Sequence, residues 1–478
     1  MVKKHLDILL VAPDYHNNEM GGTPHIPCGL GYIARSIETN NYSYRVVDLS
    51  IQPESDLFNI IKEDHPRYLG ISLMTYRIEK SYQLLETVKN NYPWLKIIIG
   101  GPHVIAAGLC LFQECQAIDI SCIGEGEETI IEILNGVHIS SIKGIHYRTE
   151  EGVFTTEKRQ FTKNIDNIPF PTYTGFDIQK YGTCMLLSSS RGCPYKCTFC
   201  GAPQFLGNMW RKRNSKGMIE ELMYWYENGY REFYFEDSLF SADKKRIQEF
   251  CDELINLNLS VNIDVNGARA DHFDEFTLKK MKKANFRNLV FGVESAKNHV
   301  LEAFKKGETI EQIETTLRIV DNLGFTMGLF FIIGGPGESY KDAIESINFS
   351  QKFKNVAFTY FFKLTPIPGT SYFEYATKMG YVDKNNKYPT GNFGFDIEAT
   401  HGNDVMSSLE LSTALKKARH IERLIRIRYY IKNNLQLRKL YIPNIFTEPL
   451  AQLLAISLVN RFARHIVSVV RSISLKTI

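Results

Sequence analysis

The sequence has no long uninterrupted apolar run, little net charge and no strongly biased tract. No stretch of about eighteen or more apolar residues occurs, so no membrane-spanning helix is expected. The formal net charge is only +3, so overall charge gives no indication of a nucleic-acid partner. No short-period repeat or low-complexity tract is present. The 478 residues, 44% apolar and 23% charged, are ordinary for a globular protein of two or three domains.

The amino-terminal residues also lack the pattern of a secretory leader. The basic start is followed by a short apolar run, LDILLVAPD at 6–14, which turns acidic at Asp14. This pattern favours a buried strand over a signal peptide. The nine cysteines are therefore expected to be free thiols in a reducing compartment, and the protein is expected to be cytoplasmic.

Short apolar strands alternate with helices in the first part of the chain. Strands are expected at 6–14, 44–50, 68–74, 96–103 and 118–124, and helices at 29–39 and 79–92. This alternation is typical of a doubly wound, Rossmann-like parallel sheet, whose ligands bind beyond the carboxyl ends of the strands. Those ends carry Ser72, Gly100, Gly101 and the turn 124–127.

A second alternating series follows a proline-rich stretch. Its six strands are expected at 184–190, 231–240, 261–270, 288–295, 326–339 and 356–370. Six strand–helix units predict a partial (β/α)6 barrel, with functional residues at the carboxyl ends of the strands. The predicted domains are 1–140, a linker with a β-hairpin at 141–175, the barrel at 176–375 and a basic, mainly helical region at 376–478.

Three cysteines, Cys193, Cys197 and Cys200, lie on one loop directly after a strand, beside Gly192 and Pro194. Three soft anionic ligands on a tight loop suit an iron–sulfur cluster. A zinc site would need a fourth ligand close by, and the neighbouring residues offer no obvious one. Three cysteines around a [4Fe–4S] cluster leave one iron open to a cofactor. The alternative is a set of buried or redox-active thiols.

With this loop, residues 176 to 375 resemble the radical S-adenosylmethionine (SAM) superfamily. The CxxxCxxC spacing, with Phe199 between the last two cysteines, is the signature of that family. The resemblance implies that the three cysteines bind a [4Fe–4S] cluster and that Phe199 is one of the cofactor-binding residues. It also implies that SAM binds the open iron and is cleaved reductively to methionine and a 5′-deoxyadenosyl radical.

Acidic residues after later strands fit the same resemblance. Asp237, in the stretch 236–240, is expected near the SAM amino group. Glu294 and Ser295 match the motif that contacts ribose and methionine. Carboxylates suit these partners because they only accept hydrogen bonds.

Two further strand ends complete the expected SAM site. Arg269 ends the third strand, and Gly334 and Gly335 open a glycine-rich motif that packs beside adenine. Glycine allows the backbone to approach a flat ring closely. The alternatives are that Arg269 and Asp271 form only a structural pair, and that Glu338 caps the helix that follows it.

Residues 5 to 140 resemble the cobalamin-binding domain that precedes many radical SAM barrels. Ser72, Gly100 and Gly101 would lie near the nucleotide tail or the corrin ring, and PCGLGY at 27–32 matches the anaerobic Mg-protoporphyrin ester cyclase-like group. The family's Asp-x-His-x-x-Gly motif is incomplete, because only its first part stands at 14–16. His16 is thus either a cobalt ligand or a solvated loop histidine. The domain either binds cobalamin without a histidine ligand or does not bind it.

The carboxyl-terminal segment is basic and amphipathic. Helices are expected at 411–441 and 449–474. A basic amphipathic pair suits peripheral contact with an anionic membrane surface, and the alternative is a helical cap that closes the barrel mouth. No aromatic–basic RNA motif is present, so no nucleic-acid partner is expected.

Three functions remain open on the sequence. The predicted one is a cobalamin-dependent radical SAM enzyme that methylates an unactivated carbon of a small-molecule or lipid-like substrate. It would take electrons from a reducing partner such as flavodoxin or ferredoxin. The second is oxidative cyclisation or ring rearrangement without methylation, and the third is iron–sulfur binding or sensing without turnover.

Overall fold

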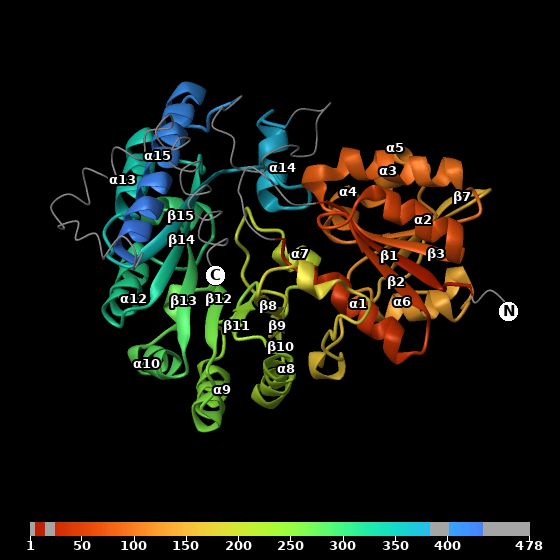
Figure 1. Cartoon of the computed structure of the whole chain (residues 1–478). Helices are drawn as coiled ribbons and strands as arrows, with labels where there is room; N and C mark the ends of the chain where they lie inside the picture. The colour runs from red at the N-terminus through yellow and green to blue at the C-terminus, as the bar shows by residue number, and fades with distance from the viewer. Residues whose placement is uncertain (1–4, 15–23, 383–400, 434–478) are drawn as a thin grey trace, which may run out of the picture. The chain divides into compact units, whose positions relative to one another are not determined.

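The computed structural model describes residues 5–14, 24–382 and 401–433 (Figure 1). The expectations for His16 and for a helix at 449–474 lie outside these residues. The chain forms two compact units. Unit 1 consists of Met1–Phe240, Lys245–Asp264 and Pro366–Phe393, and unit 2 of Ser241–Lys244, Val265–Thr365 and Gly394–Ile478.

The first sheet of unit 1 has seven strands. They are β1 (Ile8–Ala12), β2 (Tyr44–Asp48), β3 (Tyr68–Ser72), β4 (Lys96–Gly100), β5 (Ile120–Cys122), β6 (Ile145–Thr149) and β7 (Gly152–Thr155), in the order β2-β1-β3-β4-β5-β6-β7. The first five are parallel, and the hairpin β6–β7 continues the sheet in antiparallel fashion from β5. Strand order reverses at β1, and a ligand site is expected at such a reversal.

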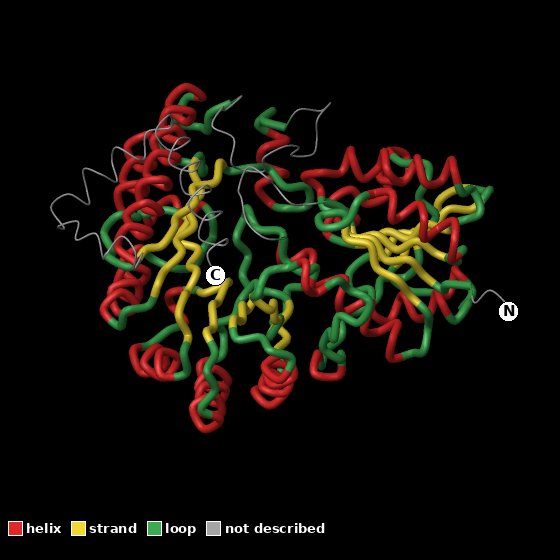
Figure 2. The backbone as a smooth tube through the Cα atoms, in the orientation of Figure 1, coloured by secondary structure: helices red, strands yellow, loops and turns green. Residues whose placement is uncertain are grey.

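Helices cover both faces of this sheet (Figure 2). They are α1 (Cys28–Thr39), α2 (Glu54–Asp64), α3 (Ile78–Asn91), α4 (Pro102–Ala107), α5 (Leu111–Glu114) and α6 (Glu127–Leu134). One core joins α2, α3 and α5 to alternate strand residues such as Leu9 and Ile71, and the other joins α1 and α6 to Leu10 and Ile98. Sequence reasoning missed α2, although Leu57, Ile60 and Ile61 have helical spacing and are buried.

The rest of unit 1 contains the beginning of the second series. Its elements are β8 (Cys184–Leu187), β9 (Ser190–Arg191), α7 (Ala202–Phe205), β10 (Arg211–Lys212), α8 (Ser215–Glu227), β11 (Glu232–Phe235), α9 (Lys244–Leu257, whose first residue belongs to unit 2) and α14 (Ser371–Lys378). Strands β8 and β11 pair in parallel, and β9 and β10 pair antiparallel. The cysteine loop follows β9 directly.

Unit 2 continues the same series. Its elements are β12 (Asn262–Ala268, which begins in unit 1), α10 (Glu275–Lys283), β13 (Phe286–Glu294), α11 (Asn298–Ala303), α12 (Ile310–Asn322), β14 (Thr326–Ile333), α13 (Tyr340–Phe349), β15 (Val356–Lys363) and α15 (Ser408–Asn433). The second sheet has six strands in the order β15-β14-β13-β12-β11-β8. This chain-order arrangement is the sheet of a partial (β/α)6 barrel, as the sequence predicted.

Helix α15 lies along the edge strand β15. The backbone N–H of Phe361 donates to the buried Glu422 carboxylate at 2.8 Å, and this bond satisfies a donor that an edge strand leaves unpaired. The helix predicted at 411–441 thus begins at Ser408, and its end beyond Asn433 lies outside the described residues. In the described part of the chain, no helix has the length and apolar character needed to span a bilayer.

Candidate functional site

The cysteine loop turns sharply before its first thiol. Gly192 has a φ of 83°, and a Cβ there would collide with the carbonyl oxygen of Met209, so only glycine fits. The N–H of Cys193 donates to the Gly207 carbonyl at 3.1 Å, and that of Cys200 to the Cys197 carbonyl at 3.2 Å. The first bond ties the start of the loop to the segment that follows it, and the second forms a turn between two of the cysteines.

The donor set of this loop fits a cubane cluster. Cys193, Cys197 and Cys200 are not joined in disulfides and are partly exposed, and Phe199 is half-buried between the last two. Among the described residues, no three His, Cys, Asp or Glu side chains converge as a single metal ion requires. The thiolates of a cubane bind different irons, so they surround the cluster instead of meeting at one point.

Asp237 anchors the strand that leads into the loop. Its carboxylate accepts from the Ser189 N–H at 2.7 Å and the Ser190 hydroxyl at 2.7 Å, and it is buried. Arg246 holds the same segment by donating to the Ser189 carbonyl at 2.8 Å. Asp237 was predicted to contact the SAM amino group, but in this structure its oxygens are occupied by the serines.

A cavity of about 380 Å³ lies in unit 1 at the carboxyl edge of the first sheet. Ser72, Gly100 and Gly101, the three residues predicted near cobalamin, all line it. A Cβ on Gly100 would meet no atom within 4 Å, and the same is true of Gly29, so a side chain at either position would project into open space. Much of the remaining lining is isoleucine and leucine. Glycine walls and apolar side chains fit a ligand with apolar faces.

Glu236 and Cys28 are cavity residues that sequence reasoning did not select. Glu236 lines the cavity and is an exposed residue, but the protein around its carboxyl group and the charge of Asp237 still raise its pKa. Burial, followed by the charges of Glu236 and Glu221, raises the pKa of the Cys28 thiol to about 12. The thiol therefore remains protonated at neutral pH.

A buried ionic network occupies the ends of β12 and β13 in unit 2. Arg269 makes two hydrogen bonds to Asp271, at 3.1 and 3.0 Å, and lies 3.5 Å from Glu308 Oε2. Lys306 Nζ lies 3.1 Å from Glu294 Oε1 and 3.5 Å from Glu308 Oε2. Arg269 and Glu294, which were predicted to contact SAM, therefore already have protein partners.

Within this network, Glu294 has a left-handed backbone conformation, and the pKa values of Asp271 and Glu308 are shifted in opposite directions. Glu294 has a φ of 65°, and its carboxylate folds back over Gly292, where a Cβ would collide with it. Burial raises the pKa of Glu308. For Asp271, burial opposes ionisation, but hydrogen bonding and the charge of Arg269 lower the pKa. Lys306 and Glu308 were missed, and their only sequence signal was a charged tetrapeptide, KGET, between two helices.

The glycine-rich loop after β14 is held by Glu338. One carboxylate oxygen accepts from the N–H groups of Gly334 at 2.6 Å and Gly335 at 3.2 Å. The other is buried without a hydrogen-bond partner, and burial raises the pKa of Glu338 to about 8. The alternative that Glu338 caps α13 is wrong, because Ser339 occupies the cap.

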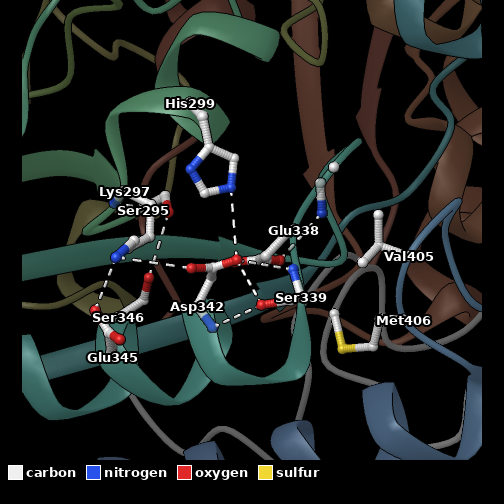
Figure 3. A network of polar contacts seen from close by, with 12 residues as sticks. Ser295, Lys297, His299, Glu338, Ser339, Asp342, Glu345, Ser346, Val405 and Met406 are labelled. Atoms are coloured by element: carbon white, nitrogen blue, oxygen red, sulfur yellow. Dashed lines mark hydrogen bonds and ion pairs between the residues drawn. The ribbon is translucent and has the colours of Figure 1, made fainter.

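The first turn of α13 carries a polar network that also reaches Ser295. Figure 3 shows Asp342 between Ser339, Lys297 and His299. The buried Ser295 hydroxyl lies 3.3 Å from that of Ser346 and accepts from the Lys297 N–H at 3.2 Å. The Ser295 hydroxyl thus joins the end of β13 to α13.

Comparison with known proteins identifies the family. The model of the radical SAM superfamily matches residues 187–350, and that of the B12 binding domain matches residues 20–134. An uncharacterized methyltransferase of Pyrococcus horikoshii is 30% identical over 445 residues, which cover 90% of this chain and 95% of the relative. This chain belongs to the radical SAM superfamily, in the group whose members carry a B12-binding domain before the radical SAM domain.

Other relatives and solved structures agree with this assignment. An anaerobic magnesium-protoporphyrin IX monomethyl ester cyclase of Rubrivivax gelatinosus is 25% identical, over 70% of this chain and 63% of the cyclase. The cobalamin-dependent SAM radical enzyme OxsB has a TM-score of 0.73 at 17% identity, over 94% of this chain and 72% of that chain. The radical SAM methyltransferase TsrM of Kitasatospora setae has a TM-score of 0.68 at 17% identity, over 78% and 76%.

These findings confirm the predicted family, fold class and enzyme class. The cofactors of the two domain families are a [4Fe–4S] cluster, SAM and cobalamin, as predicted. The third hypothesis, a sensor without turnover, is therefore set aside. The predicted domain boundaries and the roles of individual site residues stay predictions.

Proposed function

We propose that this protein is a cobalamin-dependent radical SAM methyltransferase that adds a methyl group to an unactivated carbon. The observation that carries the proposal is the lining of the unit 1 cavity. It includes the strand-end glycines of the B12-binding sheet and also Ser188, Ser190 and Arg191, and Cys193 follows two residues later. One cavity thus adjoins both cofactor regions, as transfer between two cofactors and one substrate requires.

The residues of this chain would bind and position these groups. Cys193, Cys197 and Cys200 would bind the cluster, and Ser72, Gly100 and Gly101 would contact cobalamin in the cavity. When bound, the cluster and SAM supply one-electron chemistry and cobalamin supplies a methyl group. The chain's own part is to hold these groups in reach of the substrate and to exclude water.

The proposed SAM contacts divide into direct and indirect ones. Phe199, Gly334 and Gly335 are proposed to lie against SAM. Asp237, Arg269, Glu294 and Ser295 are engaged by neighbouring side chains or backbone. Their proposed part is therefore to fix the strand ends on which they lie.

The test uses the full chain with a reconstituted cluster, incubated anaerobically with SAM, a reductant, methylcobalamin and a metabolite extract. Release of 5′-deoxyadenosine together with a product one methylene heavier is expected. The matched control replaces the three loop cysteines with serine and should release no deoxyadenosine. Deoxyadenosine with an unmethylated, dehydrogenated product would instead identify the second candidate, an oxidative cyclase, which the likeness to the magnesium-protoporphyrin cyclase favours.

A small, lipid-like substrate is supported by an aromatic face in unit 2. Phe330, Phe358, Tyr360 and Phe362 are half-buried, and the Phe330 ring lies 5.6 to 6.3 Å from the other three. They alternate along β14 and β15 with residues such as Phe331, whose ring contacts Phe349 of α13. The aqueous and organic fractions of one extract test this proposal, because conversion only in the aqueous fraction would contradict it.

The remaining partners are proposals as well. Flavodoxin or ferredoxin is proposed as the reductant, and either one replacing dithionite in the assay would support this. Peripheral membrane contact is tested by sedimentation with anionic vesicles. In α15 the apolar residues Leu411, Leu415 and Leu424 are buried, while Lys416 and Lys417 are exposed, so the basic face of this helix is the one open to such a surface.

A further inference from the structure

Four charged side chains connect the cavity wall to the cysteine loop. Glu125 and Glu127 lie in the turn after β5, and Arg191 and Arg211 face each other on β9 and β10. Arg191 lies 2.9 Å from Glu125 and 2.7 Å from Glu127. Arg211 Nη1 lies 2.9 Å from both carboxylate oxygens of Glu125. We call these four residues the arginine–glutamate clamp.

The clamp is enclosed by protein. The exposed fractions of the side chains are 12% for Arg191, 4% for Arg211, 10% for Glu125 and 13% for Glu127, so solvent screens them little. The Arg191 guanidinium also stacks over the Tyr32 ring at 4.7 Å. Enclosed arginine–carboxylate pairs hold their side chains in a fixed geometry, whereas pairs on the surface are mobile and screened by solvent.

The clamp holds both ends of the cysteine loop. Arg191 stands two residues before Cys193. Arg211 Nη2 donates to the carbonyl of Leu206 at 2.7 Å, and the adjacent Gly207 carbonyl accepts from the Cys193 N–H at 3.1 Å. A displacement of Glu125 would therefore be transmitted to the loop from both sides.

The same clamp forms part of the cavity wall. Glu125, Glu127 and Arg191 line the cavity, and so do Gly124 and Gly126 on either side of Glu125. A ligand that fills the cavity would touch the residues that fix the cysteine loop.

We propose that Glu125 is a positioning residue that couples the cavity to the cluster. Through Arg191 and Arg211 it sets the position of the cysteine loop, so that cobalamin in the cavity alters the surroundings of the cluster. This inference rests on the proposed binding of cobalamin and goes beyond it, because it assigns a communicating role to residues that bind neither iron nor substrate.

The test compares Glu125→Gln with a matched control, Glu128→Gln, in the full chain with a reconstituted cluster. Glu128 also pairs with an arginine, Arg159, at 2.9 Å, but its side chain is 65% exposed. Iron content, titration with hydroxocobalamin and the EPR spectrum of the reduced cluster with and without hydroxocobalamin are measured. A purely structural role would not produce a cofactor-dependent change in the spectrum.

The wild type and Glu128→Gln are expected to show a change in the cluster spectrum when hydroxocobalamin binds. Glu125→Gln should retain its iron, bind hydroxocobalamin about tenfold more weakly and, at saturation, show no such change. Arg191→Lys retains every charge, but a lysine cannot bond to Glu125 and Glu127 through two separate nitrogens. This variant is therefore also expected to lose the change in the cluster spectrum. It serves as the test if Glu125→Gln does not fold.

Two results would overturn the coupling. One is a cobalamin-dependent spectrum in Glu125→Gln and Arg191→Lys equal to that of the wild type, and the other is an equal loss in Glu128→Gln. A wild type that binds no hydroxocobalamin would instead contradict the proposed function, so the two failures are distinguishable.

Discussion

Single acidic residues after the buried strands have quite different surroundings. Asp237 is held by serine donors, Glu294 by a lysine, and Glu338 by two backbone N–H groups on one oxygen only. Burying a carboxylate is unfavourable unless donors or positive charge compensate it. The donors around each acid therefore decide how firmly its carboxylate is fixed.

The raised pKa of Glu338 predicts how stability depends on pH. Its pKa of about 8 in the folded state lies above the ordinary 4.5, so the folded state keeps a proton that the unfolded state releases between these values. The contribution of Glu338 to stability should thus fall as pH rises from 4.5 towards 8, by at most about 1.4 kcal/mol per pH unit. Glu338→Gln keeps an acceptor for the glycines and should remove this fall.

Urea unfolding of Glu338→Gln and wild type at pH 5 and pH 8 measures the effect, with the exposed Glu128→Gln as control. Equal pH slopes in wild type and Glu338→Gln would show that Glu338 is already ionised in the folded protein.

Lys306 gives a second prediction at this scale. Lys306→Met leaves Glu294 and Glu308 without their shared positive charge in a buried site, which should cost about 3–5 kcal/mol of stability. The neighbouring Lys305→Met, at an exposed position, should have little effect. Urea denaturation measures both, and a similar small loss in the two variants would contradict a network dependent on Lys306.

At the scale of elements, the cysteine loop depends on a backbone shape that neighbouring segments impose. Gly192 turns the chain after β9, and the carbonyl groups of residues 206–209 surround the position where a Cβ would stand. The shape of the loop therefore depends on these carbonyl groups as well as on the residues of the loop itself.

Gly192→Ala should prevent assembly of the cluster. The left-handed backbone alone costs about 1–2 kcal/mol for alanine, and the collision with Met209 must displace the loop in addition. Gly229→Ala is the matched control, since Gly229 has a φ of 94° but no atom within 4 Å of a Cβ. Iron content and the visible absorption of reconstituted protein measure the difference. Full iron content in Gly192→Ala would mean that the loop adapts.

At the scale of the whole molecule, the cavity in unit 1 adjoins both the strand ends of the first sheet and the segment that leads into the cysteine loop. Its wall contains residues from β4, the turn after β5, β9 and the end of β11. No single segment forms it, so the cavity depends on the folding of the entire unit.

Filling this cavity should abolish cobalamin binding while it leaves the iron–sulfur cluster and the cleavage of SAM intact. Gly100→Leu places a side chain in open space at an ordinary backbone conformation, so folding should persist while hydroxocobalamin binding is lost. Iron content and reductive release of deoxyadenosine from SAM should remain close to wild type, and methylated product should disappear. Wild-type affinity for hydroxocobalamin in this variant would place cobalamin outside the cavity.

Much of the fold was predictable because its signals are local. Alternating strands and helices, and a cysteine spacing that suits a cluster, are properties of contiguous residues. Helix α2 was missed because only three of its eleven residues, Leu57, Ile60 and Ile61, are buried. Ser72, Gly100 and Gly101 line one cavity because strand ends of a doubly wound sheet share one edge, and their contact with cobalamin stays a prediction.

The amino-acid sequence by itself determined the family and the class of fold, since each follows from patterns along the chain. It also predicts the three cysteines as ligands of the cluster, from their spacing. Only the tertiary structure decided the partners of the charged residues. Glu125 and Arg191 are 66 positions apart, and Asp237 and Ser189 are 48 apart. Contacts at such separations depend on how strands are ordered and packed, and no local pattern of residue types encodes them.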